Sequence, residues 1–366
     1  MIEQKITVGI LFGGKSAEHE ISLQSAKNIV AALDPKRYDA VLLHIDKKGK
    51  WHLLEQPDSL DQIPIGQSLP TGSEGCPVSM PPESAGHLMP LHKPSGFQKL
   101  DVVFPILHGP FGEDGTVQGL LKLAHVPFVG VDVLASAVGM DKDIMKRLLR
   151  DAGLPIGPYR AYKTSDPRPS FQEIQSSLGL PVFIKPANLG SSVGISKVND
   201  ATQFEAAIDL AFSFDHKIVI EANIQGREIE CGVMGNEHPI ASIPGEVIPH
   251  HNFYSYEAKY LDEKGAHTEI PANISVEHTE RIRHLAIEVF KTLQCEGLAR
   301  VDFFLTDGGE ILVNEINTMP GFTQISMFPK MWAYSGIPYS ELIDKLIGYA
   351  IQRHQRDTKL RTTYQP

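Results

Sequence analysis

The sequence predicts an α/β fold in its front half and an α+β fold in its back half. Strand-like and helix-like segments alternate up to about residue 137, and strands joined by glycine-rich turns dominate beyond it. The 366 residues are too many for one ordinary domain, so we expect two or three domains. A hydrophobic content of 42% is enough to bury their cores.

In the front half, strands are expected to alternate with helices. The first is "KITVGILFGG", an apolar run closed by two glycines, and a segment with helical spacing follows it. Because such alternation is typical of parallel sheets, we expect a doubly wound parallel sheet. Residues 56–98 are rich in Pro, Gly and Ser, so we expect loops there and at most a short strand. The expected strands are 5–14, 38–46, 101–107 and 126–131, and the expected helices are 21–33 and 116–124.

A helix over residues 140–153 is expected to open the second domain, near residue 138. Gly153 suits the C-terminal end of this helix, and Pro155 follows it. Further on, the pattern predicts antiparallel strands and one more helix. The strands are expected within 180–198, 216–224 and 227–235, and the helix at 201–213.

The segment "IKPANLGSSVG", residues 184–194, contains groups that can cradle a phosphate. Lys185 precedes the glycines, and a second strand follows them, whereas a Walker A loop leads into a helix. We therefore expect a hairpin whose glycine-rich tip can fold over phosphates with its backbone N–H groups. The alternative is a flexible hairpin with a surface lysine, and this segment alone does not decide between them.

The stretch "LARVDFFLTDGGEILVNEINTMPGF", residues 298–322, predicts a metal site. Gly308-Gly309 favours a two-residue turn, which would place Asp302 opposite Glu315 and Arg300 opposite Asn317. Residues two apart in a strand share a face, so all four side chains would project from one side. Carboxylate and amide oxygens suit Mg²⁺, and no Cys or His lies nearby for zinc. The alternative is a solvated outer face of mixed charge.

Composition argues against several classes of partner and location. The net charge of −10 disfavours nucleic acid and anionic membranes as partners. No run of 18 apolar residues predicts a membrane span, and the first residues do not resemble a signal peptide. Three widely separated cysteines form neither zinc spacing nor a disulfide framework, so we expect a reducing cytosol. They are Cys76, Cys231 and Cys295.

Eight motifs together resemble the D-alanine–D-alanine ligases of the ATP-grasp superfamily. They occur in order at family-like spacing from about residue 9 to about residue 345. They are "GGKSAEHEISL", "HGPFGEDGTVQG", "MDKDIMKRLL", "IKPANLGSSVG", "IEANIQGREIE", "YSYEAKY", "ARVDFF" and "VNEINTMPGFTQISM".

The resemblance implies a three-domain ATP-grasp ligase with an N-terminal Rossmann-like domain. The implied domains are 1–137, 138–216 and 217–366, with ATP between the second and third. The implied reaction is the ATP-driven joining of two D-alanines for peptidoglycan precursors. It also implies Mg²⁺, as two ions for which Mn²⁺ can substitute, a cytoplasmic location and a homodimer formed through the N-terminal domains.

Site residues follow from the resemblance at matching positions. The implied ATP contacts are Lys142, Lys185, Glu221, Ala222, Ile224, Glu228 and Lys259, and the implied metal ligands are Asp302, Glu315 and Asn317. Glu18 would hold the ammonium of the first substrate, and His108 would lie near that substrate. Ser326 and the Met327 backbone would contact the carboxylate of the second substrate. Arg300 and the Gly321 N–H would stabilise the oxyanion, while Ser191 and Tyr260 would close the site with Glu18.

Three other functions stay open at this point. A D-alanine–D-lactate ligase would form an ester, although Tyr260 favours an amide because ester-forming relatives commonly have phenylalanine there. Other ATP-grasp carboxylate–amine ligases would be expected to lack "EAKY". An ATP-binding regulatory module would not consume ATP, and it gives Arg300 no reason to join the metal face.

Overall fold

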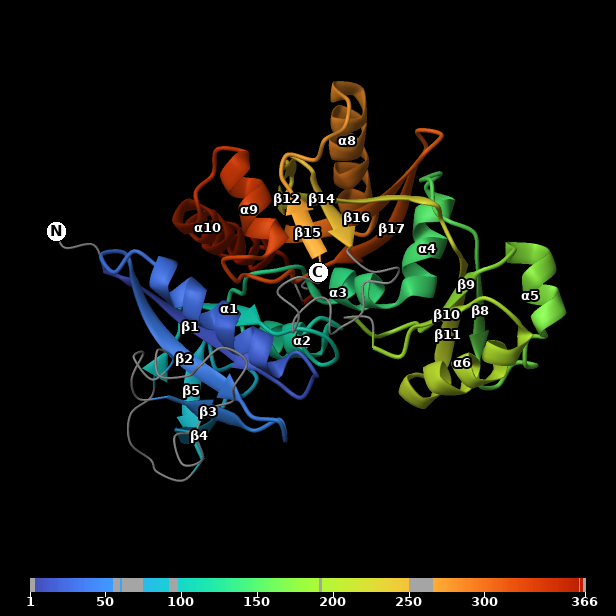
Figure 1. Cartoon of the computed structure of the whole chain (residues 1–366). Helices are drawn as coiled ribbons and strands as arrows, with labels where there is room; N and C mark the ends of the chain where they lie inside the picture. Colours follow the sequence, from blue (N-terminus) through green and yellow to red (C-terminus); the bar gives the residue numbers. More distant parts are fainter. Residues whose placement is uncertain are drawn as a thin grey trace.

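The computed structural model describes residues 4–54, 60, 75–91, 98–190, 193–249, 266–361 and 363–364. Its strands form three sheets, one at each end of the molecule and one between them (Figure 1). The front half is α/β and the rest contains two antiparallel sheets, so the predicted fold classes are confirmed. Among the described helices, none has the length and apolar character needed to cross a membrane.

The first sheet has seven strands in the order β6-β5-β4-β3-β2-β1-β7. Only β1 with β2, and β1 with β7, pair in parallel, and the strands from β3 to β6 pair antiparallel. The expectation of a parallel sheet is therefore right for β2, β1 and β7, at one end of the sheet, and wrong for β3 to β6. The strands are β1 Ile6–Gly13, β2 Tyr38–Ile45, β3 Trp51–Leu53, β4 Cys76–Ser79, β5 His87–Pro90, β6 Gln98–Lys99 and β7 Val102–Ile106.

Helices cover both faces of this first sheet. On one face, α1 (His19–Ala32) and the C-terminal helix α10 (Tyr339–Asp357) enclose a core that includes side chains from β1 and β7. On the other face lies α2 (Thr116–Leu123). The expected strand at 126–131 forms only one isolated bridge, between Val103 and Phe128, so that prediction is wrong.

Two short helices lead out of the first sheet. They are α3 (Val133–Met140) and α4 (Lys142–Asp151). The side chain of Asp141 caps α4 by accepting the N–H groups of Asp143 and Ile144, and Gly153 follows its end in a left-handed conformation, φ +73°. The expected boundary between residues 137 and 138 falls inside α3.

The second sheet is antiparallel and has four strands in the order β10-β9-β11-β8. They are β8 Tyr159–Lys163, β9 Val182–Pro186, β10 Ser196–Val198 and β11 Lys217–Ala222. Helices α5 (Phe171–Leu178) and α6 (Ala201–Phe214) share its core. Because β11 pairs with β8 and β9, this sheet extends past the boundary that we expected between residues 216 and 217.

The third sheet has six strands in the order β15-β14-β12-β16-β17, with β13 beside β12. They are β12 Gly226–Gly235, β13 Ile240–Ala241, β14 Gly245–Pro249, β15 Ala266–Glu269, β16 Gly297–Thr306 and β17 Ile311–Asn317. Helix α8 (Val276–Thr292) packs against one face. Helix α9 (Met327–Tyr334) contacts β12 and α10.

Candidate active site

The hairpin of β16 and β17 places the predicted metal face as expected. Arg300 pairs with Asn317, and Asp302 pairs with Glu315. Val301, Phe303 and Val313 point the other way, into the core under α8. The four polar side chains therefore share the face that is turned away from that core.

The turn between the two strands differs from the prediction. A Gly309 N–H to Thr306 O hydrogen bond of 2.9 Å closes it, and Gly309 has φ +81°. It is thus a three-residue loop, Asp307–Gly309, whose last residue is left-handed, and not a two-residue turn. A bulge after Asp302 makes up the difference of one residue, so the predicted pairing of Asp302 with Glu315 still holds.

An arginine organises the carboxylates on this face. Arg300 donates Nε–H to Asp302 Oδ1 and an Nη2–H to Oδ2, both at 2.7 Å. Its Nε also lies 3.1 Å from Oε2 of Glu230, which is opposite Asp302 in β12. Burial alone would lower the pKa of Arg300, but Asp302 and Glu230 raise it well above its usual value. Sequence reasoning missed Glu230, which register with Asp302 could have indicated.

Lys142 connects the metal face to the glycine-rich hairpin. Its Nζ lies 4.0 Å from Glu315 Oε2 and donates to Leu189 O at 2.6 Å. Burial, with a contribution from Lys185, lowers the pKa of Lys142, whereas Glu315 raises it. A buried ammonium that faces a partly exposed carboxylate is well placed to meet a polyphosphate.

A buried carboxylate holds two further lysines beside this point. Glu221 lies in β11, with Lys185 Nζ 2.5 Å from its Oε2 and Lys146 Nζ 3.3 Å from its Oε1. Burial would raise the pKa of Glu221, but Lys146 and Lys185 outweigh it and lower the pKa to about 2. Sequence reasoning missed Lys146, although it lies four residues after Lys142 on the same helix face.

The other predicted ATP contacts lie around this cluster. The N–H of Ala222 donates to Pro158 O at 3.0 Å. Ile224 lies in the connection from β11 to β12, and its side chain would contact a Cβ built on Gly157. Glu228 lies two residues before Glu230 in β12 and shares its face.

Glu18 stands where the first sheet meets the glycine-rich hairpin. A Cβ built on Gly109 would lie 3.4 Å from Glu18 Oε2, and one built on Gly190 would lie 3.9 Å from it. Both loops therefore approach this carboxylate closely. His108 is buried beside it, with a 3.0 Å hydrogen bond between Nδ1 and Met319 O, and Nε2 has no partner among the described residues.

The turn after β17 carries the remaining predicted residues. Asn317 Oδ1 accepts the Met319 N–H at 3.2 Å, and Ser326 Oγ accepts the Thr323 N–H at 3.1 Å. A Cβ on Gly321 would lie 2.8 Å from Ser326 Oγ, so any other residue here would push this hydroxyl group aside. Ser326 is also the residue at which α9 begins, with Met327 as its first helical residue. Ser191, Lys259 and Tyr260 lie outside the described residues.

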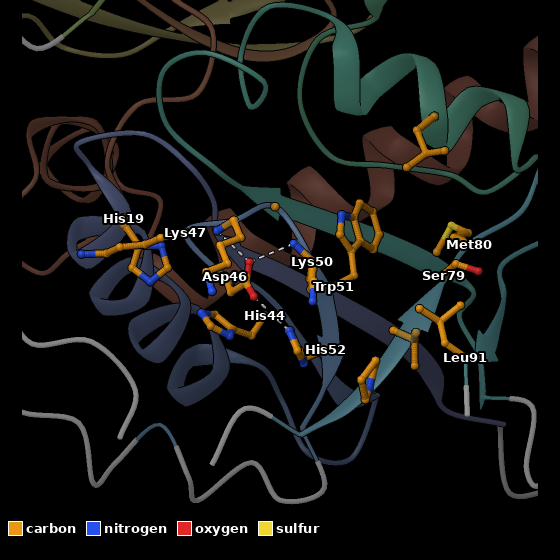
Figure 2. Close-up of a pocket in the computed structure, with 15 residues that line it drawn as sticks. His19, His44, Asp46, Lys47, Lys50, Trp51, His52, Ser79, Met80 and Leu91 are labelled. Carbon is orange, nitrogen blue, oxygen red and sulfur yellow. Dashed lines mark hydrogen bonds and ion pairs between the residues drawn. The ribbon is translucent and has the colours of Figure 1, made fainter. Parts of the chain in front are cut away.

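A cavity of about 810 Å³ lies away from this cluster, beside β2 and β3 (Figure 2). His44 and His52 face each other across the two strands, and His19 packs against His44 with 5.4 Å between ring centroids. Neither ring nitrogen of His44 has a hydrogen-bond partner within the described part of the chain. Burial lowers the pKa of His44 to about 4, so it is neutral near pH 7. None of the predicted site residues lines this cavity.

The donor set on the metal face fits a hard cation. Asp302, Glu315 and Asn317 offer oxygen atoms from one face, which suits Mg²⁺. Within the described residues, no cluster of three or more His, Cys, Asp or Glu is arranged to hold a metal. Because Mg²⁺ takes about six oxygen ligands, three side chains would leave coordination places for phosphate oxygens.

Comparison with known families agrees with this geometry. Residues 7–131 match the family model described as D-ala D-ala ligase N-terminus, and residues 148–348 match D-ala D-ala ligase C-terminus. The chain belongs to the D-alanine–D-alanine ligase family. Its fold is therefore the three-domain ATP-grasp fold with a Rossmann-like N-terminal sheet.

Individual ligases, two of D-alanine–D-alanine type and one of D-Ala:D-Ser type, resemble the chain over nearly its full length. A D-alanine–D-alanine ligase of Oceanobacillus iheyensis is 53% identical, with 98% of this chain and 99% of that protein covered. The structure of the ligase from Coxiella burnetii has a TM-score of 0.86 at 40% identity, covering 97% of this chain and 96% of that chain. The VanG D-Ala:D-Ser ligase from Enterococcus faecalis has a TM-score of 0.84 at 35% identity, covering 95% and 100%.

Proposed function

We propose that this enzyme joins two D-alanines to D-alanyl-D-alanine for peptidoglycan precursors, releasing ADP and phosphate. The observation that carries the proposal is the 4.0 Å approach of Lys142 Nζ to Glu315. This short distance places a lysine that can bind phosphate oxygens beside the carboxylates that can bind magnesium. The names of the full-length relatives support D-alanine as the substrate.

A carboxylate needs activation because it has no good leaving group. Transfer of the γ-phosphoryl group of ATP to the first D-alanine gives an acyl phosphate, which the amine of the second then attacks. Lys142 and Lys185 are proposed to spread the phosphate charge, and Lys259 to reach the γ-phosphate. Glu221, Ala222, Ile224 and Glu228 are proposed to hold the adenine and ribose.

Asp302, Glu315 and Asn317 are proposed to hold magnesium, as two ions for which Mn²⁺ can substitute. When bound, the metal supplies Lewis-acid neutralisation of the phosphate oxygens. The protein's own part is to fix the carboxylates. Arg300 does this for Asp302 with two 2.7 Å hydrogen bonds.

Glu18 is proposed to bind the ammonium of the first D-alanine, with His108 beside it. Ser326 and the Met327 backbone are proposed to bind the carboxylate of the second D-alanine. Arg300 and the Gly321 N–H are proposed to stabilise the tetrahedral oxyanion, which requires donors fixed in advance. Arg300 lies on β16, and Gly321 lies in the turn that follows β17, the strand paired with β16.

Acyl phosphates hydrolyse, so the site must exclude water during the reaction. We propose that Ser191 and Tyr260 close it together with Glu18. The close approach of Gly190 to Glu18 supports the part of the hairpin in this closure.

We further propose three domains, with one boundary near residue 137 and the other moved from residue 216 to the end of β11, near residue 222, because β11 pairs with β8 and β9. A cytoplasmic location and a homodimer formed through the N-terminal domains complete the proposal. Sedimentation of the purified protein tests the dimer, because a monomer at micromolar concentration contradicts it.

Phosphate release tests the reaction directly. The assay supplies ATP, Mg²⁺ and, separately, D-alanine, L-alanine, D-serine, glutamate or D-alanine with D-lactate, and identifies each product by mass. We expect D-alanyl-D-alanine and release that requires both Mg²⁺ and D-alanine. Activity with L-alanine or glutamate but not D-alanine would contradict the substrate, and ATP binding without turnover would indicate a regulatory module.

A further inference from the structure

Glu113 lies at the centre of the candidate site, although the proposed reaction assigns it no role. It belongs to the loop between β7 and α2. Its Oε2 accepts the Gly109 N–H at 2.6 Å, and its Oε1 accepts the Met319 N–H at 3.2 Å. One carboxyl group thus connects a loop of the first sheet with the turn after β17.

The same loop also holds Met319 by its carbonyl group. His108 Nδ1 lies 3.0 Å from Met319 O, so the loop contacts both the N–H and the C=O of this residue. Met319 lies between Asn317 and Gly321, which are proposed to bind magnesium and the oxyanion. Because the Met319 N–H is shared with Asn317 Oδ1, a shift of the loop would move the metal ligand as well.

The charges around Glu113 make this contact sensitive to what binds at Glu18. Burial, and then the charge of Glu18, raise the pKa of Glu113 to about 8, against the two N–H groups and Arg300, which lower it. Burial lowers the pKa of the neighbouring His108, so this ring adds no positive charge near pH 7. Glu113 therefore holds a proton near pH 7 more readily than an ordinary carboxyl group does.

We propose that Glu113 is a positioning residue that couples ammonium binding at Glu18 to the placement of the Asn317–Gly321 turn. This inference rests on the proposed function. An ammonium beside Glu18 cancels the smaller of the two causes that raise the pKa of Glu113, which lowers this pKa and favours loss of the proton to solvent. The resulting carboxylate accepts both N–H groups more strongly, which fixes the turn before the amine attacks.

Calorimetry measures the proton directly. D-Alanine is titrated at pH 7 into the enzyme with Mg²⁺ and ADP, which cannot supply a γ-phosphoryl group, in buffers of different ionisation enthalpy. A carboxyl group of pKa about 8 is roughly 90% protonated at pH 7, so a lower pKa in the bound state gives a net release of protons, at most about one per first site. Glu113→Gln should release none. Asp114→Asn should release as many as wild type, because Asp114 accepts the Phe111 and Thr116 N–H groups and leaves Met319 untouched.

Steady-state kinetics separates positioning from general damage to the fold. Glu113→Gln should lower kcat about 10- to 100-fold, as expected for a hydrogen bond to a charged group, with KM for ATP within about twofold. Glu113→Asp should keep the proton release, but its shorter side chain should still lose kcat. If Glu113→Gln fails to fold, the number of protons that wild type and Glu113→Asp release on binding D-alanine tests the coupling instead.

Two results would overturn the coupling. One is proton-neutral D-alanine binding by a wild-type enzyme that makes dipeptide, and the other is a wild-type kcat in Glu113→Gln. A wild-type protein that makes no dipeptide at all would instead contradict the proposed function.

Discussion

Replacing Glu221 by glutamine removes the negative charge between two buried lysines while keeping the size of the side chain. Lys185 Nζ and Lys146 Nζ lie 2.5 and 3.3 Å from its carboxylate oxygens. Folding lowers the pKa of Glu221 from 4.5 to about 2, which corresponds to about 3 kcal/mol, because a tenfold change in proton affinity is worth about 1.4 kcal/mol. We therefore expect Glu221→Gln to lower the free energy of unfolding at pH 7 by about 3 kcal/mol, as is typical when one partner of a buried ion pair is removed.

The pH dependence gives this prediction a second test. The folded pKa lies below the unfolded one, so the stabilisation is complete above about pH 4.5 and is lost as the pH falls towards 2. Urea unfolding at pH 7, 5 and 4 should show the gap between wild type and Glu221→Gln starting to narrow only at the lowest pH.

A control and a double variant sharpen the test of Glu221. Glu205→Gln removes the charge of an exposed ion pair with Arg168, and it should change stability by less than about 1 kcal/mol. Adding Lys146→Met to Glu221→Gln should recover part of the loss, because one unpaired ammonium is then gone. A Glu221→Gln protein as stable as the Glu205→Gln control, or a gap independent of pH, would refute the reasoning.

Three further predictions concern the metal face, the buried His44 and the choice of the second substrate. Glu315→Gln should lower the phosphoryl-transfer rate at least about 100-fold with little change in melting temperature, because a metal site loses a charge; near wild-type phosphate release would contradict it. His44, whose pKa falls from 6.5 to about 4 on folding, contributes up to about 3 kcal/mol that is present above pH 6.5 and lost as the pH falls towards 4. The urea midpoint should thus fall less between pH 7.5 and 5 for His44→Phe than for wild type. An equal fall in both proteins would show that His44 does not cause the loss of stability. Tyr260→Phe should still make dipeptide but raise the ratio of ester to amide when D-alanine and D-lactate compete, and an unchanged ratio would show that this hydroxyl does not select the acceptor.

Local rules predicted the metal face because strand alternation is local. The pairing of Asp302 with Glu315 follows from a period of two and a glycine turn. The turn type was wrong, since a three-residue loop and a bulge replace the expected two-residue turn. The bulge after Asp302 restored the predicted pairing, and the sequence pattern gives no sign of this bulge.

Contacts between distant segments could not be predicted in the same way. Nothing around Glu113 in the sequence indicates Met319, which lies 206 residues further on. Lys146 looks like an ordinary helix lysine until β11 places Glu221 beside it. The antiparallel edge of the first sheet was missed because its strands are only two to four residues long, too short for a clear period.

The three sheets do not share their cores equally, and this difference bears on how the site can open. One hydrophobic cluster contains side chains from β1 and β7 of the first sheet and from α1, which covers it. The same cluster includes α9 and α10, which follow the third sheet in the chain. In addition, the buried Arg353 of α10 donates to Gly130 O at 2.6 Å and to Phe128 O at 2.8 Å.

The core of the four-stranded sheet, by contrast, contains only residues from its own strands and from α5 and α6, as far as the described residues show. A movement of this sheet would expose little apolar surface of the other two, so it would cost little hydrophobic free energy. Glu18 and Gly321 lie on the parts that share a core, whereas Lys185 lies on the sheet that has its own. We therefore expect ATP to enter by displacement of the four-stranded sheet, while the first-substrate site and the oxyanion turn keep their mutual geometry.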